Sequence, residues 1–221
     1  ESVTKGEKAV RSRAHLYRNE GSDQFLERAV DAGLAYSFGS MGAGYGDVDG
    51  DGQIDIYLAN GGPIMARFEP DALFLRNQNR YVEVGEKAGV DNQGKGHGVA
   101  FADYDQDGDL DLYVGLGGHY PGDLWPNSLY RNNGIPGTML TVNLNGAAPN
   151  RSAIGGQVVL HSGNHVQRSE VQSGGGFGST DSYSLEFGLG KRTQVDSLKV
   201  FWPSGKMEQY GPLPTDQPLE F

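Results

Sequence analysis

The sequence predicts an all-β protein in two parts, and three observations support this. Apolar and polar residues alternate with a period of two in many short segments, as they do in strands. A unit recurs at a constant spacing in the first part of the chain, and the repeat then stops. Glycine makes up 35 of the 221 residues, about twice its usual share, which suits short strands joined by turns.

The repeat defines the elements of the first part. Residues 42–47 (GAGYGD) recur as residues 98–103 (GVAFAD), and residues 32–34 (AGL) recur as residues 88–90 (AGV). A segment of the type L-Y-R-N occurs three times, at residues 16–19, 74–77 and 129–132. Several short strands that repeat at roughly 50 residues are typical of a β-propeller blade. The sequence therefore predicts β-propeller-type blades, with two full repeats and part of a third.

The segment from Phe25 to Gly33 leaves two interpretations open. Its composition allows a short helix, but Gly and Asp residues interrupt it, so a turn and a strand edge fit as well.

Two stretches in the repeat carry the chemistry of the first part. Residues 47–55 (DVDGDGQID) and 103–111 (DYDQDGDLD) both read D-x-D-x-D-G-x-x-D. Alternate carboxylates in one turn repel each other, so such a turn favours a bound cation. Oxygen ligands at positions 1, 3, 5, 7 and 9 suit a hard ion with six to eight ligands, which indicates calcium and not zinc. Gly52 and Gly108 stand at position 6, where the chain bends sharply.

The residues after each stretch exclude an EF-hand. An EF-hand has a bidentate Glu at position 12 and continues into a helix, whereas position 12 here is Leu58 or Val114. Alternation with a period of two follows both stretches, which indicates a strand. We therefore expect each calcium loop to cap a β-hairpin.

Composition limits the classes of partner. The net charge is −10, but the two loops hold nine carboxylates, and without these nine it would be −1. Two calcium ions would offset four of these charges. An acidic chain with no Lys/Arg stripe argues against nucleic acid and against an anionic membrane surface. No run is apolar enough to insert into a membrane, and the absence of cysteine excludes disulfides and thiolate metal sites.

A different pattern begins at Thr138. Apolar residues alternate in five segments, at residues 139–144, 154–161, 166–171, 183–187 and 198–202. These segments predict a second all-β unit of about 80 residues, a small β-sandwich-like domain. We place the first part at residues 1–135 and the second part at residues 136–221. The last ten residues contain three prolines and are expected to be an irregular tail.

Both parts resemble known families. The first part resembles the FG-GAP/VCBS repeats of integrin-α-type propellers, whose blades carry calcium hairpins of this kind. The second part resembles the ASPIC/UnbV domain in residues 150–156 (NRSAIGG), 187–190 (FGLG) and 200–205 (VFWPSG). The pairing, which covers nearly the whole chain, is similar to the cartilage acidic protein (CRTAC-like) family, which is secreted and extracellular.

The resemblance implies the calcium ligands. In the first loop these are Asp47, Asp49, Asp51 and Asp55, with the main-chain carbonyl of Gln53. In the second loop they are Asp103, Asp105, Asp107 and Asp111, with the main-chain carbonyl of Asp109.

The number of repeats raises the question of assembly. Propellers of this type usually have about seven blades, and two blades cannot close a ring, so open sheet faces and edges would be exposed. Either the chain is a fragment of a longer propeller or several chains assemble. We expect a homo-oligomer.

Other candidate sites are expected to be structural. His161 and His165 flank a predicted hairpin turn and could face one another, but exposed turn residues are the simpler interpretation. Residues 188–192 (GLGKR) lack the spacing of a phosphate loop and are expected to form a turn. Glu69 and Asp71 are carboxylates outside the loops, expected in a solvated turn.

The sequence favours one function and leaves two alternatives. The favoured function is an extracellular (or periplasmic) binding or adhesion-type module without catalysis, with structural calcium and a protein or glycan ligand. The first alternative is a carbohydrate-active enzyme or its accessory domain, which would need a free Asp or Glu pair away from the loops. The second is a structural, self-assembling β protein.

Overall fold

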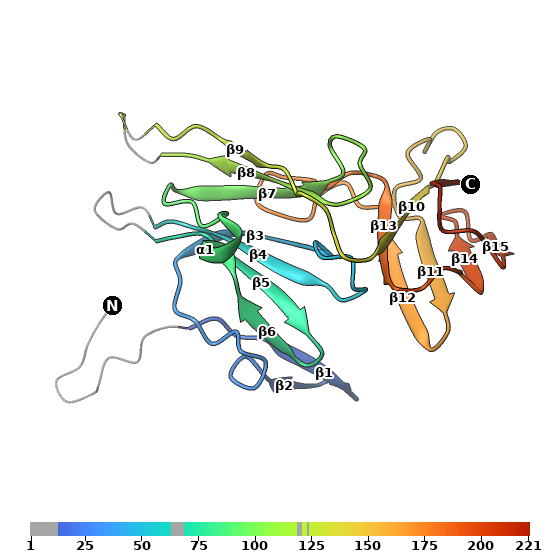
Figure 1. Cartoon of the computed structure of the whole chain (residues 1–221), viewed down its shortest axis with the longest axis horizontal. Helices are drawn as coiled ribbons and strands as arrows, with labels where there is room; N and C mark the ends of the chain where they lie inside the picture. The colour runs from blue at the N-terminus through green and yellow to red at the C-terminus, as the bar shows by residue number, and fades with distance from the viewer. Residues whose placement is uncertain (1–12, 63–68, 119–120, 123) are drawn as a thin grey trace.

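The all-β prediction is confirmed. The computed structural model describes residues 13–62, 69–118, 121–122 and 124–221, and within these ranges the regular elements are sixteen strands and one short helix, α1 (Gly85–Ala88). The strands form several mostly antiparallel sheets (Figure 1). None of the described helices is long and apolar enough to cross a membrane.

The first part contains two sheets that repeat one another. One sheet has the order β3 (Ser40–Gly46), β4 (Asp55–Asn60), β5 (Ala72–Asn77), β6 (Arg80–Glu83), and the other the order β7 (Gly96–Ala102), β8 (Asp111–Leu116), β9 (Ser128–Tyr130). All neighbouring strands in both sheets are antiparallel. Each predicted calcium loop joins the first two strands of its sheet, so the predicted hairpins are confirmed.

The N-terminal hairpin forms a sheet of its own. β1 (Tyr17–Gly21) pairs only with β2 (Gln24–Glu27) among the described residues. The open interpretation of residues 25–33 is thereby settled, because β2 is followed by turns that reach Gly33. In the next repeat, the matching strand β6 is followed by the single helical turn α1.

The register of the repeat differs by one residue from the L-Y-R-N alignment. Ile56 pairs with Phe74, and at the matching position of the next repeat Leu112 pairs with Tyr130. Tyr130 therefore takes the place of Phe74, although the motif aligned it with Leu75. The sheet ladder fixes this register, and the motif does not.

Small residues in β3 allow the two sheets to pack closely. A Cβ atom on Gly44 would lie 2.5 Å from Cγ1 of Val99 in β7. The core behind this contact is nearly solvent-free, and it includes Tyr57, Phe101 and Val114.

The second part has two sheets around one core. One sheet has the order β13 (Leu185–Gly190), β10 (Thr138–Asn143), β16 (Leu219–Glu220), and the other the order β12 (His165–Glu170), β11 (Gln157–Ser162), β14 (Ser197–Phe201), β15 (Met207–Tyr210). Buried residues of both sheets form a single cluster that includes Leu140, Phe187, Leu160 and Val200.

The prediction of an irregular C-terminal tail holds for residues 214–218 and is wrong for the end of the chain. Leu219 and Glu220 form β16, which pairs in parallel with β10, and Leu219 is buried. The Phe221 ring packs on Tyr210 at a centroid distance of 4.4 Å. Burial of these apolar residues outweighs the three prolines, which lie before the strand.

The prediction of open edges is wrong for β7. A loop of the second part crosses this edge (Figure 1). Val99 N–H donates to Ser179 Oγ (3.3 Å) and Phe101 N–H donates to Asp181 Oδ1 (2.8 Å). Ser182 N–H in turn donates to the carbonyl of Phe101 (3.3 Å). These bonds satisfy backbone groups that an edge strand leaves unpaired.

Candidate metal centres

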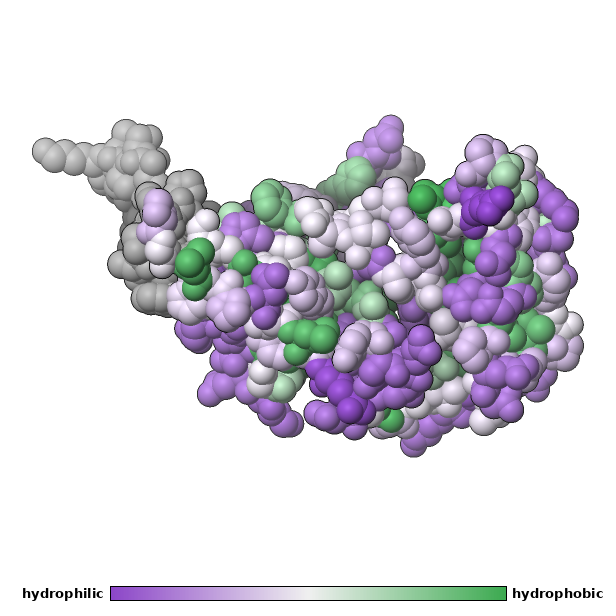
Figure 2. Space-filling view, turned by 90° about the horizontal axis from the view of Figure 1, so that it is seen from above, coloured by the Kyte–Doolittle hydropathy of each residue, from purple (hydrophilic) through white to green (hydrophobic). Residues whose placement is uncertain are grey.

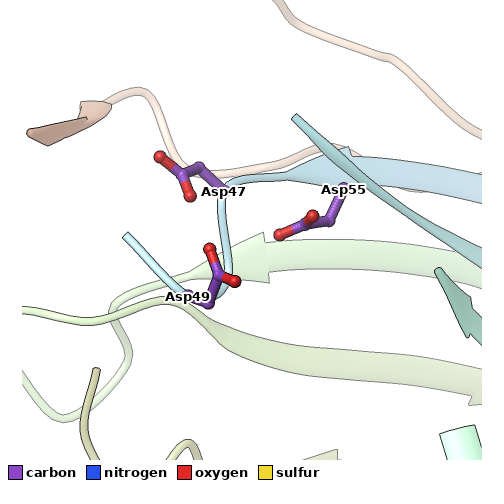
Figure 3. A group of neighbouring side chains, drawn as sticks. All are labelled: Asp47, Asp49 and Asp55. Atoms are coloured by element: carbon purple, nitrogen blue, oxygen red, sulfur yellow. The ribbon is translucent and has the colours of Figure 1, made fainter. Parts of the chain in front are cut away.

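Three carboxylates of the first loop lie around a common space (Figure 3). Asp47 follows β3, Asp49 lies in the loop and Asp55 begins β4, and one oxygen of each lies within 4.8 Å of the others. Oxygens that bind one calcium ion at 2.3–2.6 Å lie within about 5 Å of each other. The spacing and the all-oxygen donor set therefore fit a single calcium ion.

Main-chain N–H groups hold the first and last of these carboxylates. Asp47 accepts hydrogen bonds from Asp51 N–H (3.1 Å) and Gly52 N–H (2.8 Å). Asp55 accepts from Val48 N–H (2.9 Å) and Arg76 N–H (2.7 Å). Gly52 has φ +93°, which favours glycine and allows the turn that these bonds require.

The second loop repeats this arrangement. Asp103, Asp105 and Asp111 each offer an oxygen within 4.8 Å of the others. The four main-chain hydrogen bonds recur at the matching positions, from Asp107 and Gly108 to Asp103, and from Tyr104 and Asn132 to Asp111. Asn132 also joins the two loops, because its side-chain amide donates to the carbonyls of Val48 (2.9 Å) and Leu110 (3.3 Å).

The fifth-position carboxylates lie outside both groups. Asp51 accepts hydrogen bonds from the main-chain N–H (2.7 Å) and the side-chain amide (2.8 Å) of Gln53. Asp107 accepts from the Arg131 guanidinium (3.2 Å). The structure therefore brings together three of the four aspartates implied as ligands in each loop.

Arg131 distinguishes the second loop from the first. Its Nε lies 2.8 Å from Asp105 Oδ2, and its Nη2 lies 3.2 Å from Asp107 Oδ2. In the observed register, Leu75 takes the place of Arg131 beside the first loop. Sequence reasoning missed the ion pairs of Arg131 with Asp105 and Asp107, because the L-Y-R-N motif aligned Arg131 with Arg76 and gave no sign of a contact with the loop.

Asp109 adds a buried charge to the second loop. Its side chain is 4% exposed, and Oδ1 has no hydrogen-bond partner among the described residues. Burial raises the pKa of Asp109 to about 6. The resemblance implied only the main-chain carbonyl of Asp109 as a calcium ligand. The difference at position 7, which is Asp here and Gln in the first loop, could have pointed to the extra carboxylate.

Burial also makes the first loop electrostatically costly without a cation. It raises the pKa of Asp47 to about 6 and the pKa of Asp55 to about 7, although the main-chain hydrogen bonds act in the opposite direction. A cation among these carboxylates would offset this cost.

The F-G-L-G strand of the second part lies directly on the first loop. A Cβ atom on Gly188 would overlap Asp47 Oδ2, so only glycine fits there. Gly190 N–H donates to the carbonyl of Gly50 (2.8 Å). Gly188 and Gly190 belong to β13, so the prediction of a turn at these residues is wrong.

His165 lies at the same contact, with Nε2 3.1 Å from the carbonyl oxygen of Gly52. His161 pairs with Val166, and His165 pairs with Ser162, so the two histidines are on opposite faces of their hairpin. They do not face one another, and the interpretation of His165 as an exposed turn residue is wrong.

Asp71 is buried, so its predicted place in a solvated turn is wrong. It is 1% exposed and accepts hydrogen bonds from Asn60 N–H (2.6 Å) and the Tyr57 hydroxyl (3.0 Å). Burial raises its pKa to about 7. Glu69 accepts from Gly39 N–H (2.6 Å). Both carboxylates therefore accept hydrogen bonds from main-chain N–H groups and have a structural role here.

Two further carboxylates, which sequence reasoning missed, line a cavity of about 330 Å³ between the two parts. They are Asp181 and Glu186, and Tyr45 and Arg168 line the same cavity. Burial raises the pKa of Glu186 to about 7, and the Ser182 hydroxyl donates to its carboxylate (3.2 Å). These residues come from distant strands and loops, so no local motif marks them.

The comparison with protein families agrees with the resemblance of the second part. Residues 146–221 match the family model described as ASPIC and UnbV. The second part carries an ASPIC/UnbV match. The match covers about a third of the chain, and the strand β10 precedes it. No curated protein matches the chain. The resemblance of the first part to FG-GAP/VCBS repeats stays a prediction.

Proposed function

We propose that this protein is a non-catalytic, extracellular or periplasmic binding or adhesion-type module in which two calcium ions are structural. The observation that supports this most is the recurrence, at matching positions of the repeat, of three aspartate oxygens within 4.8 Å of one another. One such group could be an ordinary turn, but two groups held by the same hydrogen bonds indicate a selected geometry.

The chemistry of calcium suits this role. Each ion would supply two positive charges among carboxylates that the hairpin brings together, held by Asp47, Asp49 and Asp55 or by Asp103, Asp105 and Asp111. The loop backbone would position these side chains through the N–H bonds to the first and last aspartates. At a free calcium concentration 100 times Kd, each site would stabilise the fold by about 2.7 kcal/mol.

The location follows from calcium supply. Loops of modest affinity are filled where calcium is millimolar, which is outside the cell. The match of residues 146–221 to ASPIC and UnbV is consistent with the CRTAC-like resemblance, which implies secretion.

A protein or glycan is the proposed ligand. The face in Figure 2 shows apolar residues in separate small groups among hydrophilic ones over the described part of the surface. A mixed surface of this kind suits a reversible contact with a polar partner.

The N-terminal hairpin supports association into a homo-oligomer. A two-stranded hairpin is at best marginally stable by itself in water, and here Tyr17 is 60% and Phe25 63% exposed. A second copy that packs on this hairpin would bury both rings. A mass in solution above 23.7 kDa that returns to the monomer value in Phe25→Ser supports this assembly, and a monomeric wild type contradicts it.

One observation favours the enzyme alternative. Asp181 and Glu186 are carboxylates that belong to neither calcium loop, and both line the cavity between the two parts, next to Asp47 of the first loop. A carboxyl group whose pKa is raised to about 7 is suited to donate a proton near neutral pH. Glycan turnover by the wild type that is lost in Glu186→Gln would establish this alternative.

Thermal melting with calcium and with excess chelator tests the proposal. The wild type is expected to melt at a much lower temperature in chelator. The double variant Asp49→Asn with Asp105→Asn is expected to melt at one low temperature in both buffers. Asp23→Asn, an exposed charge change outside the loops, serves as the control. A wild type that melts at the same temperature in both buffers would overturn structural calcium.

A further inference from the structure

We propose that calcium in the first loop fixes the second part of the chain against the first part, whereas calcium in the second loop does not. The inference rests on the proposed function, because it requires the first loop to bind calcium. It assigns the second part as the binding partner of one calcium loop.

The contact with the first loop is direct and backbone-tight. The carboxylate of Asp47 occupies the space where a side chain at position 188 would lie. Next to it, Gly190 N–H donates to the carbonyl of Gly50 at 2.8 Å. The strand β13 thus packs on Asp47, the first expected calcium ligand, and on Gly50 in the same loop.

The neighbouring strand β12 continues the contact. His165 Nε2 lies 3.1 Å from the carbonyl oxygen of Gly52, so the imidazole meets the sharp turn of the loop. Gln167 donates from its side-chain amide to the carbonyl of Gly188 (2.8 Å), which ties β12 to β13 at this place. Two strands from different sheets of the second part therefore meet on one loop.

The second loop lacks this contact. A Cβ atom on Gly108, the counterpart of Gly52, would have no atom within 4 Å. Between this loop and the second part lies a cavity of about 590 Å³, lined by Asp103, Gly108 and Glu186 among others. Arg131 already offsets part of the charge of this loop. The repeat thus provides two similar loops, of which one is covered and one is open.

Electrostatics makes calcium and docking cooperative at the covered loop. Asp47 is 3% exposed, whereas its counterpart Asp103 in the open loop is half-buried, so the docked second part helps to hold the first carboxylate away from water. Removing such charges from water without a counter-charge is unfavourable, and a cation reverses the balance. Calcium binding to the first loop and docking of the second part therefore favour each other, and the coupling is reciprocal.

The chelated protein should loosen and not separate. The bonds from Val99 and Phe101 to Ser179 and Asp181 do not involve the carboxylates that would bind calcium. They would keep the two parts attached while the contact at β13 opens.

A distance measurement between the two parts tests the inference. The chain has no cysteine, so Asn79→Cys and Ser204→Cys introduce a single pair of spin labels at exposed positions in the first and second parts. With calcium, we expect one narrow distance distribution, and with chelator a broad one. Added to this pair, Asp49→Asn should give the broad distribution even with calcium, whereas the matched Asp105→Asn should keep the narrow one.

Calcium titration tests the reciprocal effect. With the second site removed by Asp105→Asn, His165→Ala should weaken calcium binding to the first loop by about fivefold or more. Asn164→Ala, an exposed change in the adjacent turn, should leave the affinity unchanged. An unchanged affinity in His165→Ala would contradict the coupling.

The outcomes separate the two proposals. Calcium binding to the first loop with an unchanged distance distribution would overturn this inference and leave the proposed function standing. Broadening by Asp105→Asn equal to that by Asp49→Asn would overturn the assignment to the first loop. The absence of calcium binding to either loop would overturn both proposals.

Discussion

At the scale of single residues, Arg131 differentiates two loops of nearly identical sequence pattern. Its guanidinium lies between two carboxylates of the second loop, at 2.8 Å from Asp105 and 3.2 Å from Asp107. A cation that is part of the chain competes with a bound ion for the same charge. Because the Arg131 side chain is 61% exposed, solvent screens its charge and keeps this competition weak.

Arg131→Gln should therefore strengthen calcium binding to the second loop by up to about fivefold, in line with an exposed ion pair. The same change should lower the stability of the calcium-free protein slightly, because the aspartates lose their counter-charge. Calorimetric titration in an Asp49→Asn background isolates this site. Arg18→Gln, which removes an ion pair with Glu20 far from the loops, is the control. Weaker binding in Arg131→Gln would contradict the competition.

Asp71 makes stability depend on pH. Burial raises its folded pKa to about 7, above the value of about 3.9 in an unfolded chain, and the charge of Asp91 acts in the same direction. The folded state therefore binds the extra proton between about pH 4 and pH 7, and the free energy of unfolding falls as pH rises through that window. In the next repeat Asn127 takes this place and donates to the Tyr113 hydroxyl.

Asp71→Asn should consequently stabilise the protein at pH 8, on the order of 2 kcal/mol, and change little at pH 4. The amide keeps an acceptor for Asn60 N–H, and its NH₂ group donates to the Tyr57 hydroxyl, which then donates to the carbonyl of Val90 (2.7 Å). Urea unfolding at both pH values measures the difference. Destabilisation at pH 8 would show that the carboxylate itself is required.

At the scale of elements, the sequence pattern predicted those features of the fold that depend on residues close together in the chain. The two Asp-rich hairpins and the alternation of their strands followed from sequence, because turn composition and the period of two act within about fifteen residues. The register at Tyr130 and the strand at Leu219 did not follow, because each depends on pairing with a distant strand.

The two groups of three aspartates also show that contacts between distant segments cannot be predicted from local sequence. Three aspartates of each loop converge as expected, since their spacing in the turn is local. Arg131 and Gly188 reach the loops from other elements, and no spacing in the sequence announces their contacts.

Gly44→Ala tests the close packing of β3 on β7. The added Cβ atom would lie 2.5 Å from Val99 Cγ1, so the sheets would have to separate, at a cost of about 1–3 kcal/mol. Gly115→Ala is the matched control in β8, because its Cβ atom would lie 3.6 Å from the nearest atom. Equal stability of Gly44→Ala and Gly115→Ala in urea unfolding would contradict the steric account.

At the scale of the whole molecule, the two parts of the chain form one connected structure. The second part supplies residues 179–182 to the edge of β7 and the strand β13 to the first calcium loop. Blades that would otherwise expose edges are partly covered from within the chain. Calcium should therefore stabilise the molecule as a unit, and not only its hairpins.

Calorimetric titration of the calcium-free protein tests the central claim most directly. We predict two calcium ions bound per chain, one in Asp49→Asn, one in Asp105→Asn and none in the double variant. Asp23→Asn should bind two. A wild type that binds no calcium, or single variants that still bind two ions, would contradict the assignment of the two hairpin loops as calcium sites.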